Sequence, residues 1–245
     1  MGDILRTIRP LLSMPSRLLA IGAHPDDVEF GCAAILINEI RQGNPVKIWV
    51  LSKGEAGSQG TPEQREGEAR RAAALMGAEI EFADFGGDCH IEYTPPNTIR
   101  LARQIRTDRP DIVLAPHIGE NQHPDHARVG RLVRDAARVA RYGGLAELQP
   151  LPTHAIGHLY YYTVTQEFGL CPDILIDVSD ARDLWEQAML CHESQVKSKS
   201  YVEMRLAATR SLGCQAGVAY AMGLYANDPV LLERVSSLTR SSRTF

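Results

Sequence analysis

The chain has few of the features that mark secreted, membrane-spanning or nucleic-acid-binding proteins. Its five cysteines form no Cys-x-x-Cys pair and are odd in number, which argues against both a zinc knuckle and a disulfide framework. We therefore expect a protein of the reducing cytoplasm. No apolar run reaches the roughly 18 residues that a membrane-spanning helix needs. Pro10 and Pro15 interrupt the amphipathic start of the chain, so a signal peptide is not expected.

An excess of positive charge is also missing. The formal net charge is -4 at pH 7, so long-range attraction to nucleic acid or to an anionic membrane is not expected. With 44% apolar and 23% charged residues, the 245-residue chain has the composition of a globular domain with a substantial core. We expect one domain over residues 17–245. Residues 1–16 are expected to form an extension that packs on this domain or on a partner subunit.

Short apolar runs alternate with amphipathic segments along the chain. Strands are expected at residues 17–23, 46–52, 79–85, 111–116, 158–164 and 173–179. Helices are expected at residues 28–42, 61–76, 97–107, 124–142, 180–193 and 199–213. This alternation predicts a single Rossmann-like α/β domain, with a mostly parallel sheet flanked by helices on both faces.

Two short runs stand out, AHPDD at residues 23–27 and HPDH at residues 123–126. Each follows a predicted strand, so both are expected at the carboxyl edge of the sheet, where ligands bind. Two histidines and a carboxylate, with one position open for water, form the ligand set of catalytic zinc. His24 and Asp27 can supply two ligands from one turn, and His126 can supply the third.

The same runs contain further groups suited to proton transfer. Of the adjacent carboxylates Asp26 and Asp27, one can bind a metal while the other accepts a proton from water. His123 can stabilise an oxyanion and protonate a leaving nitrogen, and Asp125 can position that imidazole. Together these groups indicate metal-assisted hydrolysis.

Plainer interpretations of the two runs stay open at this point. Carboxylates at a helix start, such as Asp26 or Asp125, often do no more than cap the first turn and compensate the helix dipole. A nucleotide-binding turn would read G-x-G-x-x-G, but the segment 22–27 lacks the central glycine and has two carboxylates where phosphates would lie. A metal- or sugar-binding module without activity would need neither Asp26 nor His123. Hydrolysis of a non-sugar amide or ester on the same metal also stays open.

The paired runs closely resemble the PIG-L/LmbE-like family of zinc-dependent N-deacetylases, which remove acetyl groups from N-acetylglucosamine (GlcNAc) conjugates. The similarity covers about residues 17–235 and includes the loop and helix start at residues 53–65. The family resemblance implies a small GlcNAc-type substrate and a Zn²⁺ ion, for which another divalent ion such as Fe²⁺ is an alternative. Because family members are often oligomeric, a homo-oligomer is expected.

The resemblance also assigns roles to individual residues. It implies metal ligation by His24, Asp27 and His126. It implies that Asp26 is the general base and that His123, oriented by Asp125, stabilises the oxyanion. It further implies that Arg65 and Asp88 face the substrate, and similarity to one branch of the family implies the same of Tyr201. Plainer alternatives are a helix-surface residue for Arg65, a turn former for Asp88 and a packed core residue for Tyr201.

Within the family, the later part of the chain is most similar to the bacillithiol-biosynthesis branch, which deacetylates N-acetylglucosaminyl-malate. The residues that carry this similarity include LYYY at 159–162, HESQ at 192–195 and GVAYA at 217–221. Two positions depart from the branch: Cys89-His90 replaces an Arg-Gly pair, and Ala155 replaces an arginine. Both departures fall where the aglycone is expected, so the sequence does not assign the aglycone. Cys89 and His90 are either extra soft metal ligands or, as the plainer interpretation, part of a loop with no metal role.

Overall fold

The structure, a computed structural model, is built around one seven-stranded sheet. It describes residues 15–119, 122–165, 169–197, 200–237 and 240–242, so nearly all of the predicted extension, residues 1–16, lies outside the described part. The strands are β1 (Leu18–Gly22), β2 (Val46–Val50), β3 (Glu79–Phe82), β4 (Ile112–Pro116), β5 (His158–Tyr162), β6 (Ile174–Asp177) and β7 (Ala221–Ala226). Their order across the sheet is β3-β2-β1-β4-β5-β7-β6.

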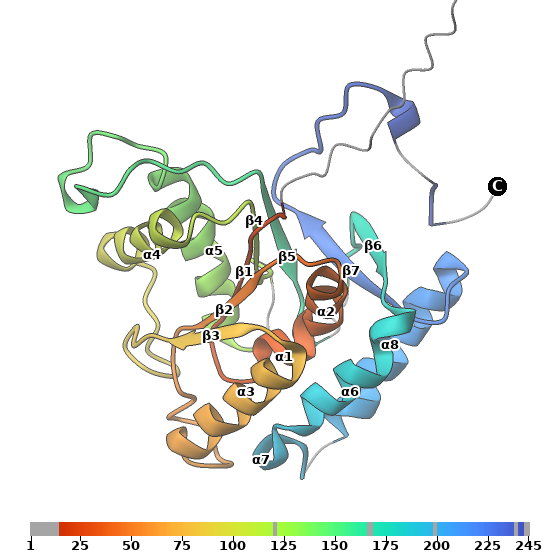
Figure 1. The fold of residues 1–245 in the computed structure, drawn as a ribbon. Coiled ribbons are helices and arrows are strands. Elements are labelled where there is room, and N and C mark those ends of the chain that lie inside the picture. Colours follow the sequence, from red (N-terminus) through yellow and green to blue (C-terminus); the bar gives the residue numbers. More distant parts are fainter. Residues whose placement is uncertain (1–14, 120–121, 166–168, 198–199, 238–239, 243–245) are drawn as a thin grey trace, which may run out of the picture.

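Helices cover both faces of the sheet, as the sequence predicts (Figure 1). They are α1 (Asp27–Gly31), α2 (Ala33–Arg41), α3 (Pro62–Met76), α4 (Pro95–Asp108), α5 (Pro124–Val139), α6 (Arg182–Leu190), α7 (Glu193–Val196) and α8 (Tyr201–Ala216). Side chains of β1 alternate, so Leu18 and Ala20 pack in one apolar core with α1, α2, α3 and α6. Leu19 and Ile21 pack in a second core with α4 and α5. Because both faces are buried, the strand appears in the sequence as a continuous apolar run.

Within the described residues, only β7 runs against the other strands. β1 pairs in parallel with β2 and β4, and these pair in parallel with β3 and β5. β7 pairs antiparallel with β5 and with β6. The mostly parallel sheet is confirmed, but β7 is missing from the predicted strands. Its apolar run follows closely on α8, which ends at the left-handed Gly217, and a short apolar run next to a helix shows no period that marks it as a strand.

The prediction of one helix at residues 28–42 is wrong, because the structure has two helices there, α1 and α2. They are separated at Cys32, whose φ of -146° and ψ of 5° are not helical. Arg205 of α8 donates from Nε to the carbonyl oxygen of Phe30 at 2.7 Å and from Nη2 to that of Gly31 at 3.5 Å. A side chain from a distant helix thus binds carbonyls that a continuous helix would use internally, and such a partner leaves no local signal in the sequence.

The start of α3 follows the sequence prediction and fixes the loop before it. Thr61 caps the helix by accepting a hydrogen bond from the backbone N–H of Gln64 at 3.2 Å, and proline occupies the first turn. The helix ends at Gly77, whose φ of 84° is left-handed. This defined start places Arg65, in the first turns of α3, next to the loop that follows β2.

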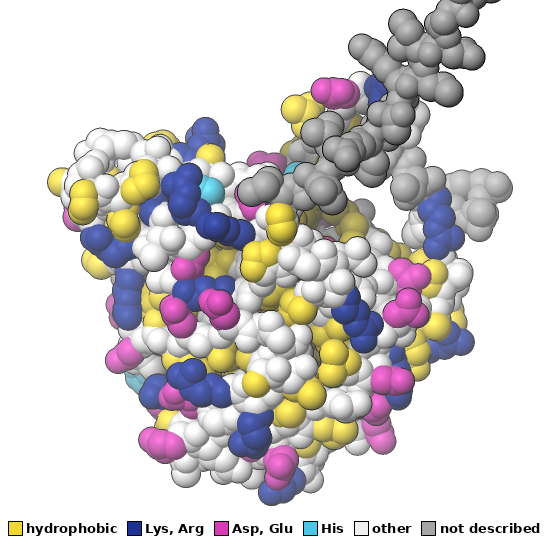
Figure 2. Space-filling view, in the orientation of Figure 1, with side chains coloured by type: hydrophobic (Ala, Val, Ile, Leu, Met, Phe, Trp, Pro, Cys, Tyr) yellow, Lys and Arg dark blue, Asp and Glu magenta, His cyan; other side chains and the backbone are white. Residues whose placement is uncertain are grey.

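The described surface carries side chains of both charges. The face seen in Figure 2 carries acidic and basic side chains next to one another, in keeping with the net charge of -4. No helix in the described ranges is both long and apolar enough to cross a bilayer. The five cysteines are all free thiols.

Candidate metal centre and its pocket

Both His/Asp runs lie at the carboxyl edge of the sheet, on strands that are direct neighbours. β1 and β4 pair with each other, and the chain order reverses between them, which is where doubly wound sheets form a crevice. A cavity of about 320 Å³ lies at this point. Its walls include most of the predicted site residues, namely His24, Asp26, Asp27, Arg65, Asp88, His123, His126 and Tyr201.

The three predicted metal ligands converge at the base of this cavity. His24, Asp27 and His126 expose only 6%, 2% and 3% of their surface, and their ligand atoms lie within 4.8 Å of one another. His126 Nε2 is 3.0 Å from Asp27 Oδ1, and His24 Nδ1 is 3.5 Å from Asp27 Oδ2. Burial alone would raise the pKa of Asp27, but the two imidazoles hold it well below its usual range.

This donor set fits a catalytic divalent ion. The carboxylate of Asp27 is fixed because its Oδ2 accepts hydrogen bonds from the backbone N–H groups of Ala23 at 2.8 Å and His24 at 2.9 Å. Two imidazoles and one carboxylate are the ligands of hydrolytic zinc, and they leave a coordination position open toward the pocket. A buried, anchored ionised carboxylate between two buried histidines is costly without a cation, so the arrangement suits a metal.

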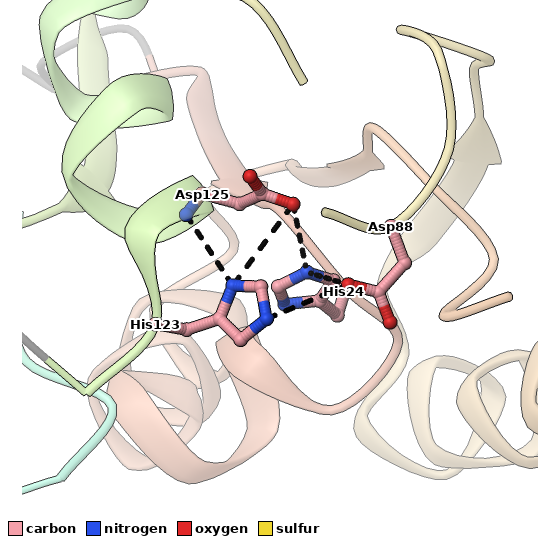
Figure 3. A group of neighbouring side chains, drawn as sticks. All are labelled: His24, Asp88, His123 and Asp125. Carbon is pink, nitrogen blue, oxygen red and sulfur yellow. Dashed lines mark hydrogen bonds and ion pairs between the residues drawn. The ribbon is translucent and has the colours of Figure 1, made fainter. Parts of the chain in front are cut away.

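Two further carboxylates flank His24 on its other side (Figure 3). His24 Nε2 is 3.1 Å from Asp88 Oδ1 and 3.4 Å from Asp125 Oδ2. Asp125 is fully buried, and it also accepts hydrogen bonds from the backbone N–H of Cys89 at 2.8 Å and from Arg128 Nη1 at 2.9 Å. Carboxylates in this position orient a ligating histidine and raise its basicity. The hydrogen bond to His24 lowers the pKa of Asp88.

His123 stands at the start of α5 as its N-cap. The backbone N–H of Asp125 donates to His123 Nδ1 at 3.3 Å, which assigns the imidazole proton to Nε2. Burial and the neighbouring His24 and His126 lower the pKa of His123, so the neutral ring is favoured. Asp125 Oδ2 is 3.9 Å from His123 Nδ1, compared with 3.4 Å from His24 Nε2, so Asp125 contacts His24 more closely than His123.

Asp26 has an unusual backbone. Its φ of 116° lies in the half of backbone space that residues other than glycine rarely adopt. Such strain persists where the surrounding structure enforces it, and it is concentrated at functional sites. Burial raises the pKa of Asp26 to about 6, against the opposing effect of the Arg65 guanidinium. A carboxylate with this pKa can exchange protons near neutral pH.

Arg65 links the turn after β1 to the loop after β2. Its Nη2 donates to the carbonyl oxygen of Pro25 at 3.0 Å and lies 3.4 Å from Asp26 Oδ2, while Nη1 donates to the carbonyl oxygen of Gly54 at 3.1 Å. The side chain is therefore part of the pocket wall and also holds the turn that carries Asp26. Tyr201, the first residue of α8, lines the same cavity and packs edge-on against Phe30.

Some residues at the site are not identified by sequence reasoning. Cys89, which the sequence leaves open as an extra soft metal ligand or a loop residue with no metal role, lines the cavity with a left-handed φ of 67°. Gln122, Thr165, Gln195 and Met204 also line the cavity. They are single polar or apolar residues on loops and helix starts, and nothing in the local pattern distinguishes them from surface positions.

A layer of buried polar side chains lies behind the α3 side of the pocket. Glu68 of α3, which is 1% exposed, accepts hydrogen bonds from the backbone N–H of Ser194 at 2.9 Å and from its Oγ at 2.6 Å. Nearby, His192 Nε2 lies 3.5 Å from Glu29 Oε2, and both side chains are almost fully buried. These contacts attach α7 to α3 and α1, and so hold the wall that carries Gln195.

Comparison with known proteins gives one matching family model and several relatives. The family model PIG-L, described as GlcNAc-PI de-N-acetylase, matches residues 19–137. A diacetylchitobiose deacetylase from Thermococcus kodakarensis is 30% identical over 198 residues, which is 73% of this chain and 70% of the relative. A 4-oxalmesaconate hydratase from Pseudomonas putida is 22% identical over 250 residues, which is 94% of this chain and 96% of the relative.

Similarity to a solved structure extends over nearly the whole chain. The crystal structure of a conserved protein from Thermus thermophilus has a TM-score of 0.81 and 31% identity, and it covers 92% of this chain and 100% of that chain. The segment matched by the family model contains both His/Asp runs, which meet in the pocket between β1 and β4. The chain therefore belongs to the PIG-L (GlcNAc-PI de-N-acetylase) family.

Proposed function

We propose that the protein is a metal-dependent N-deacetylase that hydrolyses the acetamide group of a GlcNAc-type glycoconjugate. Deacetylase relatives support the class of reaction. The observation that carries the proposal is the position of Asp26 beside the buried group of His24, Asp27 and His126. The backbone of Asp26 is strained, and the pKa of its carboxyl group is raised. A structural or binding role for these three residues would not need this neighbour.

His24, Asp27 and His126 would hold the metal, and Zn²⁺ is the ion that we propose, with Fe²⁺ as an alternative. A divalent ion at this site supplies Lewis acidity and lowers the pKa of water. His24 donates from Nε2 to the carboxylates of Asp88 and Asp125, which thereby orient its ring. In this arrangement Asp125 acts through His24 at least as much as through His123, because it lies closer to His24.

Asp26 would move the proton, and His123 would stabilise the oxyanion. Asp26 accepts a proton from the water that attacks the acetyl carbonyl carbon, so the carbonyl oxygen becomes an oxyanion. His123 carries its proton on Nε2, because Nδ1 accepts from the backbone of Asp125, and it can therefore donate to this oxyanion as a neutral ring. When the C–N bond breaks, the leaving nitrogen takes the proton that Asp26 accepted from the water, and acetate and the free amine are released, while His123 keeps its proton on Nε2.

The substrate would be a small sugar conjugate. The 320 Å³ cavity has room for a monosaccharide, and its walls are rich in polar groups. We propose that Arg65, Asp88 and Tyr201 face the sugar, and that the conjugate resembles N-acetylglucosaminyl-malate of the bacillithiol pathway. We further propose that the protein acts in the cytoplasm as a homo-oligomer.

The first test is Asp26→Asn, with Asp183→Asn as the matched control on the exposed part of α6. Asp26→Asn is expected to keep its metal but to lose acetate release by about 10²- to 10⁴-fold, because a general base is removed. Asp183→Asn is expected to match wild type. Wild-type turnover in Asp26→Asn would remove the support for the proposed base. His24→Ala is expected to lose the metal by elemental analysis.

A substrate panel separates this proposal from its alternative, a hydratase. The panel contains GlcNAc conjugates with malate, with inositol and without an aglycone, each scored for acetate release, together with 4-oxalmesaconate scored for water addition. Release of acetate from a GlcNAc conjugate supports the proposal. Turnover of 4-oxalmesaconate with no acetate from any conjugate would favour the hydratase reaction of the Pseudomonas putida relative.

A further inference from the structure

Three side-chain atoms of different chemistry meet on the pocket wall next to the candidate metal centre. Cys89 Sγ is 3.4 Å from Asp88 Oδ1 and 3.7 Å from His123 Nε2. His123 Nε2 is 3.5 Å from Asp88 Oδ1. All three residues line the cavity, Cys89 is exposed, and the His123 side chain is 30% exposed, so an ion in the pocket can reach them.

The edges of this triangle match those of a tetrahedral zinc site. With bonds of about 2.3 Å to sulfur and about 2.0 to 2.2 Å to nitrogen or oxygen, tetrahedral ligand atoms lie about 3.3 to 3.7 Å apart. We infer that Asp88, Cys89 and His123 form a second metal site, which takes Zn²⁺ or a similar thiophilic divalent ion and is separate from the site of His24, Asp27 and His126. The fourth position faces the pocket, where water can occupy it.

A second observation points to the same place without involving the thiol. Ligand atoms of Asp88, His123 and Asp125 lie within 4.8 Å of one another and of His24, which belongs to the first site and borders the second. Figure 3 shows His24 and His123 side by side, with Asp88 and Asp125 around them. The carboxylate of Asp125 adds negative charge next to this site, 3.9 Å from His123 Nδ1.

The backbone holds Cys89 in the position that the second site needs. Its φ of 67° is left-handed, a backbone region that residues other than glycine rarely adopt. Its N–H donates to Asp125 Oδ2 at 2.8 Å, and the N–H of Asp88 donates to Glu55 Oε2 at 2.8 Å. These two hydrogen bonds, one to the buried carboxylate of Asp125 and one to the exposed residue Glu55, fix the turn, so the thiol stays over the pocket.

Occupation of the second site would inhibit the enzyme. An ion bound to His123 Nε2 requires the ring proton on Nδ1, next to Asp125 Oδ2 and in place of the backbone contact there. Binding to Cys89 displaces the thiol proton, so one proton passes to solvent without any change of oxidation state. His123 Nε2 then has no proton to donate to an oxyanion in the pocket. We therefore expect one equivalent of zinc to activate and an excess to inhibit. This consequence rests on the proposed function, whereas the binding of the ion does not.

Cobalt titration of the metal-free protein tests the binding. Wild type is expected to bind two equivalents of Co²⁺, and only the second should add a thiolate-to-cobalt charge-transfer band. Cys89→Ser should bind the first equivalent without that band, and Cys214→Ser, which changes an exposed thiol on α8, should behave as wild type. A wild-type protein that binds one equivalent only, or a band that persists in Cys89→Ser, would overturn the second site.

Zinc inhibition tests the consequence, with each protein normalised to its own activity at one equivalent of Zn²⁺. Excess zinc is expected to inhibit wild type and Cys214→Ser, and about tenfold or more zinc should be needed for Cys89→Ser. Excess Mg²⁺, which prefers oxygen ligands, should not inhibit. Equal inhibition constants in wild type and Cys89→Ser would overturn the inference. If no substrate is turned over, the proposed function fails, while the cobalt titration still decides whether the second site exists.

Discussion

The variant Asp26→Gly is expected to be more stable than the variant Asp26→Ala, although neither should release acetate. Asp26 has φ 116° and ψ -26°, a conformation that glycine adopts without strain and alanine does not. Both substitutions remove the carboxylate and its contact with Arg65. The comparison therefore isolates the strain that the turn after β1 imposes on a side-chain-bearing residue.

The size of the difference follows from two opposing effects. A residue other than glycine in such a backbone region costs about 1 to 3 kcal/mol. Glycine also has more conformational entropy in the unfolded chain, which destabilises the folded state by about 0.4 to 1 kcal/mol and offsets part of the gain from relieved strain. The net advantage of Asp26→Gly over Asp26→Ala is about 1 kcal/mol, which raises the melting temperature by about 2 °C for a chain of this length.

Thermal unfolding of the two variants, loaded with metal to the same content by elemental analysis, measures this difference. Acetate release from GlcNAc conjugates is measured on the same samples. If Asp26→Gly melts at or below the temperature of Asp26→Ala, the backbone strain at this turn is refuted. If either variant turns over at the wild-type rate, the strained residue is not the general base.

Three further predictions concern the surroundings of the pocket. Gly54→Ala places a Cβ onto the Arg65 guanidinium at a left-handed position, and kcat/KM is expected to fall about 10- to 100-fold at unchanged metal content. Ser194→Ala removes the hydroxyl that donates to buried Glu68, and denaturant unfolding should show a loss of about 1 to 3 kcal/mol. In metal-free protein, burial raises the pKa of Asp26 from 3.8 to about 6, so folding favours its protonated form. Wild type should therefore lose stability relative to Asp26→Asn as the pH rises through this interval, and a flat difference would contradict the shift.

The sequence predicts the central part of this fold because the physical signals there are local. Strands covered on both faces are continuous apolar runs, and the start of α3 is marked by a capping threonine followed by proline. The position of the two His/Asp runs follows from one further rule, that ligands bind at the carboxyl edge of a parallel sheet. These signals suffice to bring His24 and His126 into one pocket.

What the sequence does not predict depends on contacts between distant segments. The break at Cys32 is associated with Arg205, which lies on a helix far along the chain. Asp125 is assigned to His123 from its place in the sequence, yet its carboxylate lies closer to His24 across the sheet edge. The position of Cys89 over the pocket depends on a left-handed turn that its neighbours impose, and a cysteine gives no local sign of such a turn.

The pairing of β1 with β4 also affects when the site can form during folding. His24 and Asp125 are separated by 101 residues, and β2, α3, β3 and α4 lie between the two runs. Contacts of such high sequence separation form slowly, because a long loop must be ordered before they stabilise anything. During synthesis, the first run leaves the ribosome well before its partner exists. The proposed metal is therefore expected to bind only after β1 and β4 have paired. Its binding then stabilises the folded state at a late step of folding, because its ligands come from both runs.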